Sequence, residues 1–485
     1  MCLETSMLLC LITQGNNLLR TAYGIKKQLH KTHEIYESCV IQKYSHYFYT
    51  EYRLLLRTTV NHHLKHPENF KQQVLQWSQQ FDDVVWLDSN NHNDSYSNYD
   101  AVLAVDAFTA IKTDYFDAFE RLKEYQSITN DWIFGYLTYD LKNTTEHLKS
   151  QKYDGLEFPD LYFFQPKKLF LIKDNNVEIQ YLQMVDDEIE QDLLEIEQSN
   201  SPLIEQSSHP IKIKLRIHKD EYFEKVNRML AHIHRGDIYE ANFCQEFYAE
   251  DSEINAIETF KKLNKISKPP FATFLKTGDK YLMSASPERY IKKSGSSVIS
   301  QPIKGTAKRS LDSTEDKKLK EELSKDEKER SENIMIVDLV RNDLSHTAQK
   351  GSVKVEELCK VYSFLQVHQM ISTISSQVDA ETSSVDIIKT TFPMGSMTGA
   401  PKISAMKIIE NLEETKRGLY SGSVGYFTPK GDFDFNVIIR SILYNATKKY
   451  ISYSVGSAIT SKSNPLKEYE ECLIKAKAMR QVLEN

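Results

Sequence analysis

The sequence lacks the excess of positive charge that binds nucleic acids and anionic membranes. Its 485 residues include 61 lysines and arginines against 68 aspartates and glutamates, which gives a formal net charge of −7. No polybasic block departs from this balance, so a general nucleic-acid or lipid surface is excluded. An anionic small ligand must therefore be held by local groups.

Cysteine pairs and long apolar runs are also scarce. The six cysteines are scattered, with neither a CxxC pair nor a Cys/His zinc spacing, which is typical of a reducing compartment. The apolar run from Met7 to Ile12 follows Glu4 and is too short for a signal peptide. No window has the length of a transmembrane span. We therefore expect a cytoplasmic protein with no membrane association.

The length predicts about two to four domains, or one unusually large one. Residues 1–50 show no clean period and are interpreted as an uncertain N-terminal extension, whose deletion we expect to leave activity unchanged. Residues 55–195 mix helical and strand patterns and are predicted to form an N-terminal subdomain. A polar stretch near 195–210 reads as a linker to a catalytic domain over 210–485.

Helices and strands alternate without a regular βαβ repeat. The spacing over 220–235 predicts an amphipathic helix that ends at Gly236. "PPFATFLKTGDKYLMSASPERY" predicts two strands around a Thr-Gly-Asp turn. The fold class is therefore α+β with large antiparallel sheets.

Two pairs of glutamates stand three residues apart in segments with a helical pattern. They are Glu329 and Glu332 in "KERSENIMIVDLVRND", and Glu468 and Glu471 in "KEYEECLIKAKAM". Each pair falls on one face of its helix, and two such faces together would offer oxygen ligands to a hard cation. Magnesium fits because it takes one or two carboxylates, water and an anionic substrate. The alternative is ordinary surface charge.

The turn "FPMGSMTGAPK" leads into a predicted helix with Pro401 near its first position. The free N–H groups of such a helix start attract an anion. A phosphate-binding P-loop is excluded because Ala-Pro-Lys follows Gly399, which breaks the required pattern. A carboxylate ligand and an unoccupied helix start remain as alternatives.

Two further segments carry isolated polar side chains. In "DFDFNVIIRSILY" the apolar residues from Phe433 to Ile439 alternate on one face of a predicted strand, and Arg440 lies on the other. Such an arginine either clamps a carboxylate ligand or pairs with a structural acid. Glu288 directly follows Pro287 at a strand end and could act as a general acid if it is buried.

The stretch "QPIKGTAKR" holds Lys304 between a Pro-Ile step and Gly305. A lysine is a nucleophile only as the neutral amine, so burial or a nearby cation must lower its pKa. A stiff approach and a glycine would fix the amine while letting a ligand come close. The alternative is a surface lysine.

Six segments in this order carry a family resemblance: "SPERY", "PIKGT", "ENIMIVDLVRNDL", "GSMTGAPKISAMKIIENLEE", "YSGSVGYF" and "KEYEECLIKAKAM". With them the chain resembles the chorismate-utilising family, which includes the large subunits of anthranilate and aminodeoxychorismate synthases and the isochorismate and salicylate synthases. The resemblance is strong over about 220–485, weaker over about 55–190, and does not cover 1–50. It implies a two-sheet antiparallel β-sandwich flanked by helices, to which both sequence halves contribute strands.

The resemblance also implies roles for single residues around chorismate and Mg²⁺. Glu332 and Glu471 match the metal ligands of the family, with Glu329 and Glu468 beside them. Glu288 matches the acid that protonates the departing 4-hydroxyl. The matching substrate-binding positions are Ser396 in the "GSMTGAPK" turn, Arg440, and the backbone near Gly456.

The position of Lys304 separates activities within the family. Anthranilate synthases usually read Pro-Ile-Ala-Gly-Thr, whereas the aminodeoxychorismate branch reads Pro-Ile-Lys-Gly-Thr, as here. In that branch the lysine amine attacks C2 and displaces the 4-hydroxyl, and ammonia then enters at C4 and expels the lysine. Isochorismate and salicylate enzymes place a lysine base where this chain has Glu240, so water activation is not expected. The resemblance favours component I of aminodeoxychorismate synthase, for para-aminobenzoate and folate synthesis, with anthranilate synthase component I as the alternative.

Three departures from the family pattern affect these expectations. Gln369 stands where the family often has histidine, so either His368 takes that role or the amide does. Ala458 replaces a glycine in "GSAITSKS", which affects the backbone contacts expected there. No "LLES" signature of tryptophan-inhibited enzymes is present, so feedback by tryptophan is not expected. Because the sequence ends soon after the last motif, we expect no fused glutaminase, and ammonia from a separate glutamine amidotransferase subunit or from solution.

Overall fold

The computed structural model describes residues 56–92, 95–146, 148–199, 211–364 and 367–484. Of the described residues, those from 56 to 58 and from 182 to 187 belong to one compact unit, and the rest belong to the other. The site lies in the second unit. The predictions for residues 1–50 and for most of the 195–210 linker fall outside the described residues.

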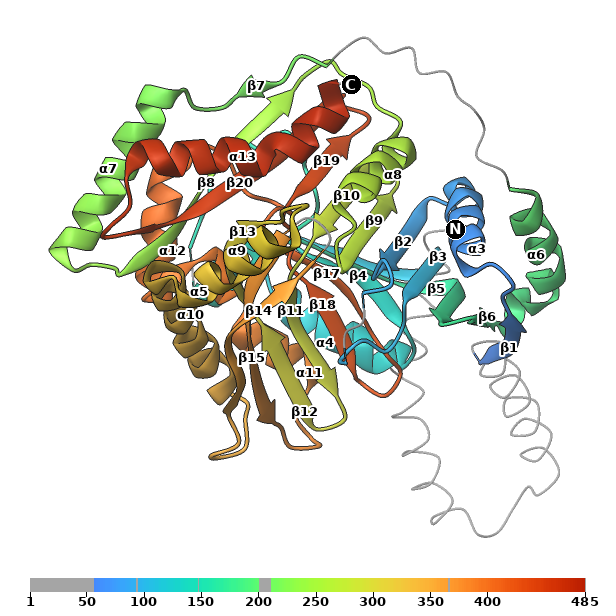
Figure 1. Cartoon of the computed structure of the whole chain (residues 1–485). Helices are drawn as coiled ribbons and strands as arrows, with labels where there is room; N and C mark the ends of the chain where they lie inside the picture. The colour runs from blue at the N-terminus through green and yellow to red at the C-terminus, as the bar shows by residue number, and fades with distance from the viewer. Residues whose placement is uncertain (1–55, 93–94, 147, 200–210, 365–366, 485) are drawn as a thin grey trace. The chain divides into compact units, whose positions relative to one another are not determined.

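The part of the chain before residue 200 supplies six strands and four helices that carry labels in Figure 1. Their bounds are β1 Arg57–His63, α3 Pro67–Trp77, β2 Asp83–Asp88, β3 Ala101–Thr113, α4 Ala118–Thr129, β4 Ile133–Leu137, α5 Lys142–Glu146, β5 Leu161–Lys173, β6 Asn176–Leu182 and α6 Ile189–Gln198.

The part after residue 210 begins with β7 Lys214–Leu215, α7 Lys219–Arg235, β8 Glu240–Ala249, α8 Ala256–Ser267, β9 Phe271–Thr277, β10 Lys280–Ser286, β11 Arg289–Ser294, β12 Ser297–Gln301, β13 Ile303–Lys308, α9 Ser313–Lys325 and α10 Glu327–Ser345. It continues with β14 Lys354–Ser363, β15 Val367–Gln377, α11 Ser384–Thr391, η4 Gly395–Met397, β16 Gly399–Ala400, α12 Lys402–Leu412, β17 Ser423–Phe427, β18 Phe433–Asn436, β19 Ser441–Asn445, β20 Tyr450–Thr460 and α13 Pro465–Glu484.

The strands form two antiparallel series that meet at β5. One series runs β5–β3–β2–β9–β10–β19–β20–β8. The other runs β5–β4–β17–β18–β11–β12–β15, with β13 and β14 also paired to β15. Strands from both halves of the sequence pair directly, as in β2–β9 and β4–β17. The predicted α+β fold with two antiparallel sheets is therefore confirmed.

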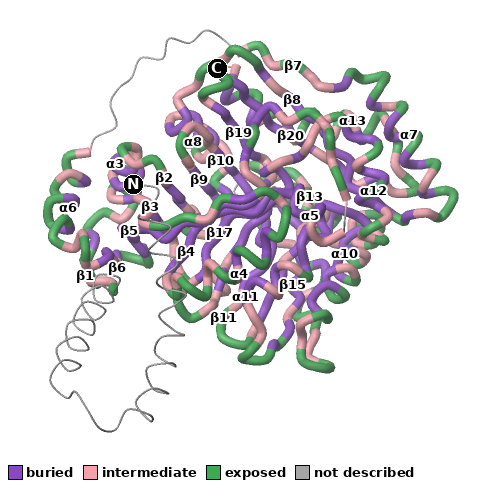
Figure 2. Tube along the Cα trace, turned by 180° about the vertical axis from the view of Figure 1, so that it is seen from behind, coloured by how far each residue is buried: buried purple, intermediate pink, exposed green. Residues whose placement is uncertain are grey.

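Helices cover the outer faces of these sheets. Helix α13 lies along β20, α12 against β8, α8 against β10 and α10 against β15 (Figure 1). Helix α7 ends as predicted, because Gly236 adopts a left-handed conformation with φ +88°. Between the sheets the strand centres are buried (Figure 2), and the Phe435 ring makes edge-on contacts with Phe163 and Phe427. No helix of the described residues is long and apolar enough to cross a membrane.

Two chain segments cross together from one sheet to the other. One joins β10 to β11 and carries Glu288, and the other joins β18 to β19 and carries Arg440. They stay hydrogen-bonded as they cross, through Val437 N–H to the Glu288 carbonyl and Ala285 N–H to the Arg440 carbonyl. The prediction of one continuous strand through residues 433–440 is thus wrong. The chain changes sheets there, and Arg440 lies in the crossing with φ +52°.

Candidate active site

Lys304 lies inside the protein on strand β13. Its ammonium nitrogen is 2.9 Å from the Oε1 atom of Glu240, at the start of strand β8. The Lys304 side chain is 11% exposed and that of Glu240 is 1% exposed, so the alternative of a surface lysine is wrong. The second carboxylate oxygen of Glu240 is buried and has no hydrogen-bond partner in the described residues.

A β-bulge sets the position of the lysine. The ladder between β13 and β15 shifts register between Ile303 and Thr306, so Lys304 and Gly305 together face a single residue of β15. Gly305 has φ +93°, and a side chain there would come within 3.2 Å of the Glu329 carboxylate. Glycine thus suits the backbone and also lets the acidic helix α10 approach the lysine.

The charge state of Lys304 differs from the expectation of a lowered pKa. Burial alone would lower the pKa of this amine. The carboxylate of Glu240, with those of Glu332 and Glu288 behind it, outweighs burial and raises the pKa of Lys304 above its ordinary value. The lysine is therefore an ammonium ion in this state and must lose a proton before it can attack a carbon atom.

Glu288 is buried at the crossing between the sheets. Burial raises the pKa of its carboxyl to about 7, although a hydrogen bond with Ser396 and the charges of Lys304 and Arg440 oppose the shift. A carboxyl with this pKa is protonated in about half of the molecules at neutral pH, which suits a general acid.

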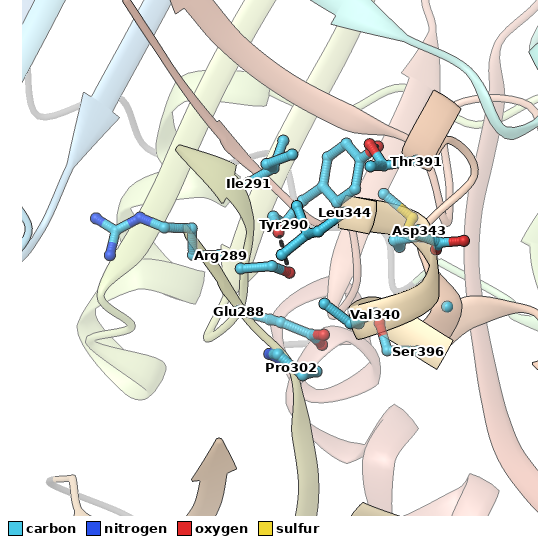
Figure 3. A pocket seen from close by; sticks show the side chains of 13 residues that line it. Glu288, Arg289, Tyr290, Ile291, Pro302, Val340, Asp343, Leu344, Thr391 and Ser396 are labelled. Carbon is cyan, nitrogen blue, oxygen red and sulfur yellow. Dashed lines mark hydrogen bonds between the residues drawn. The ribbon is translucent and has the colours of Figure 1, made fainter. Parts of the chain in front are cut away.

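Ser396 lies in the short helix η4 and is held close to strand β8. Strand β16 places Ala400 opposite Glu240, and the Asn242 side-chain amide donates to the Ser396 carbonyl at 3.1 Å. Figure 3 shows Glu288 and Ser396 beside each other at a small cavity. The walls of the cavity are largely apolar and include Ile291, Val340, Leu344 and Met394.

The four predicted metal ligands lie on two helices, Glu329 and Glu332 on α10 and Glu468 and Glu471 on α13. The ammonium group of Lys328 lies 3.7 Å from Glu332 and 3.9 Å from Glu468. Burial opposes the charge on Lys328, but all four carboxylates together raise its pKa. The structure thus brings the two acidic faces together around one cationic group.

This acidic face fits a divalent cation. The Oε1 atom of Glu332 is buried and has no hydrogen-bond partner in the described residues, although Lys328 lies 3.7 Å from it. Burial raises the pKa of that carboxyl to about 7. Across the described ranges, no three acidic, histidine or cysteine side chains are gathered tightly enough to hold a metal ion by themselves. Magnesium does not require such a cluster, because one or two carboxylates suffice when water and substrate oxygens complete its shell.

Arg440 and Gly456 are the two other predicted substrate-binding positions. The Arg440 guanidinium has no ion-pair partner in the part of the chain that the structure describes, and Glu288 is the acid that acts on it. The Gly456 carbonyl on β20 accepts a hydrogen bond from Lys475 at 3.0 Å, and Lys475 also pairs with Glu471 at 2.7 Å. The Arg440 guanidinium is therefore available to an anionic group, and its role as a carboxylate clamp stays a prediction.

His368 and Gln369 project from opposite faces of strand β15. The His368 ring lies 2.9 Å from the Ser363 hydroxyl and 3.1 Å from Asp316, which ties β15 to helix α9. Gln369 is buried, and its side-chain carbonyl has no hydrogen-bond partner in the described residues. Of the two alternatives, the structure favours the amide of Gln369 as the group available to a ligand.

Sequence reasoning missed three charged side chains at the site. Glu240 was expected only to exclude water activation, and its pairing with Lys304 joins residues 64 positions apart, for which no local signal exists. Lys328 and Lys475 stand four residues before Glu332 and four after Glu471. That spacing on one helix face could have identified both.

The chain is similar to known proteins over most of its length. The profile of the chorismate binding enzymes matches residues 70–481. An anthranilate synthase component I-like protein from Synechocystis is 33% identical over 75% of this chain and 75% of its own length. An aminodeoxychorismate synthase component 1 from Klebsiella aerogenes is 32% identical over 72% of this chain and 77% of its own. The solved anthranilate synthase component I from Streptococcus pneumoniae superposes with a TM-score of 0.68 at 25% identity, over 80% of this chain and 93% of that one.

Proposed function

The chain belongs to the family of chorismate binding enzymes, and from this premise we propose that it aminates chorismate as component 1 of an aminodeoxychorismate synthase. The reaction replaces the 4-hydroxyl of chorismate by an amino group from ammonia and gives 4-amino-4-deoxychorismate. This product would serve para-aminobenzoate and folate synthesis.

The observation that carries the proposal is the position of Lys304. The Lys304 side chain is 11% exposed and faces the carboxylates of Glu240, Glu332 and Glu288. It stands beside Glu288, a buried acid whose pKa of about 7 suits proton donation to a leaving group. An amine and an acid close together are what displacement of a hydroxyl by a lysine requires.

In the proposed mechanism, the neutral amine of Lys304 bonds to C2 of chorismate. The ring double bonds shift, the C4–O bond breaks, and Glu288 gives its proton to the departing hydroxyl, which leaves as water. Ammonia then bonds to C4 and the C2–N bond to Lys304 breaks. The new amino group returns one proton to Glu288, so the acid is restored. Arg440 holds a substrate carboxylate during these steps.

We propose Glu332 and Glu471 as magnesium ligands, with Glu329 and Glu468 beside them. Magnesium, when bound, would neutralise carboxylate charge and orient the substrate ring. The ammonium of Lys328, which lies between Glu332 and Glu468, supports a place for positive charge.

Ammonia is proposed to come from a separate glutamine amidotransferase subunit. The cavity beside Glu288 and Ser396 supports entry of a small neutral molecule, because its walls are largely apolar. Activity with glutamine should therefore require the partner, whereas activity with a high concentration of ammonium should not.

Product identification tests the proposed function. The purified chain is incubated with chorismate, ammonium and magnesium, with and without a chelator. The products are then separated and identified by mass spectrometry. We expect 4-amino-4-deoxychorismate, formed only with the divalent cation. Anthranilate synthase activity is the second candidate, favoured by the Synechocystis and Streptococcus relatives. Anthranilate and pyruvate as the products would establish it in place of our proposal.

A further inference from the structure

The pair formed by Lys304 and Glu240 leaves a chemical question that rests on the proposed function. Both side chains are nearly buried, and their charged atoms are 2.9 Å apart. An ammonium ion cannot attack C2, so its proton must go to another group. Bulk water is poorly placed to accept it, since the amine is largely enclosed.

We propose that Glu240 takes the proton of Lys304 before the attack on C2, keeps it while lysine is bonded to the substrate, and returns it when lysine is expelled. Glu240 is then a catalytic residue, because its Oε1 atom touches the nitrogen atom that reacts. Its distance from that nitrogen is within the range required of a general base.

The protons balance through both steps. Transfer of one proton turns the ammonium and carboxylate into a neutral amine and a neutral carboxylic acid. The amine bonds to C2 and becomes a secondary ammonium group, while Glu288 protonates the departing hydroxyl. When ammonia bonds to C4, the C2–N bond breaks and its electrons return to the lysine nitrogen. The free amine then recovers its proton from Glu240.

Among the acids near Lys304, Glu240 is the one placed to accept the lysine proton. Lys304 is faced by Glu240 from β8, Glu332 from α10 and Glu288 from the crossing segment, and it also acts on Glu471 of α13. Glu332 belongs to the acidic face around Lys328, and Glu288 supplies a proton to the leaving group. Only Glu240 among these four is within hydrogen-bond distance of the amine in the described structure.

The other oxygen of Glu240 distinguishes this pair from a structural one. A structural buried carboxylate normally has partners for both oxygens. Glu246, six residues along the same strand, has them: one oxygen accepts from Arg216 at 2.9 Å, and the other from Tyr450 and Ser452 at 2.8 Å each. The Oε2 atom of Glu240 has no partner in the described residues. Because this oxygen is not used by a structural hydrogen bond, the Glu240 carboxyl can be neutral in one step of the reaction and charged in another.

The test measures the covalent adduct directly. Wild type, Glu240→Gln and Glu246→Gln are mixed with chorismate and magnesium in a single turnover, quenched, and analysed by intact-protein and peptide mass spectrometry for mass added at Lys304. Glu246→Gln is the matched control, since it alters another buried glutamate of β8. Circular dichroism and chorismate binding establish that each variant is folded.

We expect Glu240→Gln to form the adduct about 10²-fold more slowly than wild type near pH 7. The ratio of the variant rate to the wild-type rate should then rise by up to about tenfold per pH unit until Lys304 is neutral in the variant, because the lysine proton must go to solvent. The ionisation of Glu288 affects both proteins and cancels in this ratio. Glu246→Gln should keep the wild-type pH dependence.

A second variant tests whether the slower reaction of Glu240→Gln comes from loss of the carboxylate and not from the new glutamine side chain. Glu240→Ala leaves room for a small carboxylate, so added formate should restore adduct formation by at least tenfold, whereas it should not affect wild type. Equal rates and equal pH dependence in wild type and Glu240→Gln, or no effect of formate on a folded Glu240→Ala, would overturn the inference alone. A wild-type protein that forms no adduct would overturn the lysine mechanism and this inference together.

Discussion

Two buried ion pairs contact the first residues of strand β8, and they differ in how fully they are hydrogen-bonded. The first joins Lys304 to Glu240 at 2.9 Å. The second joins Arg417 to Glu413 at 2.7 Å and reaches the strand through the Asn242 carbonyl at 2.8 Å. Both pairs are almost inaccessible to water, so burial alone does not separate them.

The Arg417 pair is saturated. Its guanidinium donates to both oxygens of Glu413 and to the carbonyls of Asn242 and Met397, and Glu413 also accepts from the Cys244 N–H group. By contrast, an oxygen of Glu240 has no hydrogen-bond partner among the described residues, and neither has an oxygen of Gln369. Saturated polar groups stabilise one arrangement, whereas unsatisfied ones are costly unless a ligand or a reaction uses them.

The difference explains how the fold supports its site. Arg417 ties strand β8 to the loop of Met397, next to Ser396, and so fixes the frame in which Glu240 and Ser396 lie. The Lys304 pair stands inside that frame with unused hydrogen-bonding capacity. Changes to the first pair should therefore affect stability, and changes to the second should affect chemistry.

The largest expected effect is on activity at Lys304. Replacement by alanine should slow amination by about 10³-fold or more, because the covalent route is lost. Lys304→Arg should be equally inactive, since a guanidinium is not a nucleophile, yet it preserves a cation beside Glu240 and should unfold in urea close to wild type. Product formation and urea denaturation measure the two effects. An active Lys304→Arg variant would contradict the assignment of a nucleophile.

The next effect concerns Glu288 and pH. Because burial raises the pKa of this carboxyl to about 7, the acid is protonated below that pH, and adduct formation should fall as pH rises through about 7. Glu288→Gln should lose about 10²-fold in rate and lose this dependence. Single-turnover rates measured across this range would show both, and an unchanged profile in the variant would exclude Glu288 as the acid.

The same raised pKa makes a prediction about stability. The folded protein binds the Glu288 proton more tightly than the unfolded chain, so this group stabilises the fold below pH 4.5 and loses that contribution as pH rises to about 7. Urea unfolding of wild type and Glu288→Gln across this interval should show a smaller decline of the free energy of unfolding in the variant. An equal decline would place the proton elsewhere.

The same double replacement should affect stability differently at the two ion pairs. Methionine at positions 304 and 240 exchanges an unsaturated pair for apolar groups, so the free energy of unfolding should stay the same or rise by about 1–4 kcal/mol. Methionine at positions 417 and 413 leaves the carbonyls of Asn242 and Met397 and the Cys244 N–H group without partners, which should cost about 3 kcal/mol or more. Urea denaturation of both double variants tests the comparison. Equal losses in the free energy of unfolding of the two double variants would contradict the difference between the pairs.

Much of this site could be predicted because its signals are local. The pairs Glu329/Glu332 and Glu468/Glu471 have helical spacing, and their segments are helical in the structure. The sequence signal at Lys304 is also local, because it consists of a proline before the lysine and a glycine after it. The β-bulge at Gly305 is the structural feature behind this signal.

The parts that could not be predicted depend on tertiary contacts. The alternating pattern over 433–440 gave no sign that the chain changes sheets. Apolar residues are buried both before and after the crossing, so the sequence looks the same on its two sides. The raised pKa of Lys304 comes from Glu240, which no spacing connects to it. Whether His368 or Gln369 faces the site depended on Asp316, a residue of a separate helix.

The smallest effect tests the backbone that carries the unsaturated pair. Gly305 and Gly278 both have positive φ, +93° and +57°, but nothing lies near an added side chain at Gly278, whereas Gly305 has Glu329 at 3.2 Å. Gly278→Ala should cost only backbone strain, about 1 kcal/mol, and leave amination unchanged. Gly305→Ala should cost about 1–3 kcal/mol and also slow amination, because the bulge and helix α10 must separate. If both variants kept full activity, the position of Lys304 would not depend on the bulge, and the stiff approach to the amine would have no role in the chemistry.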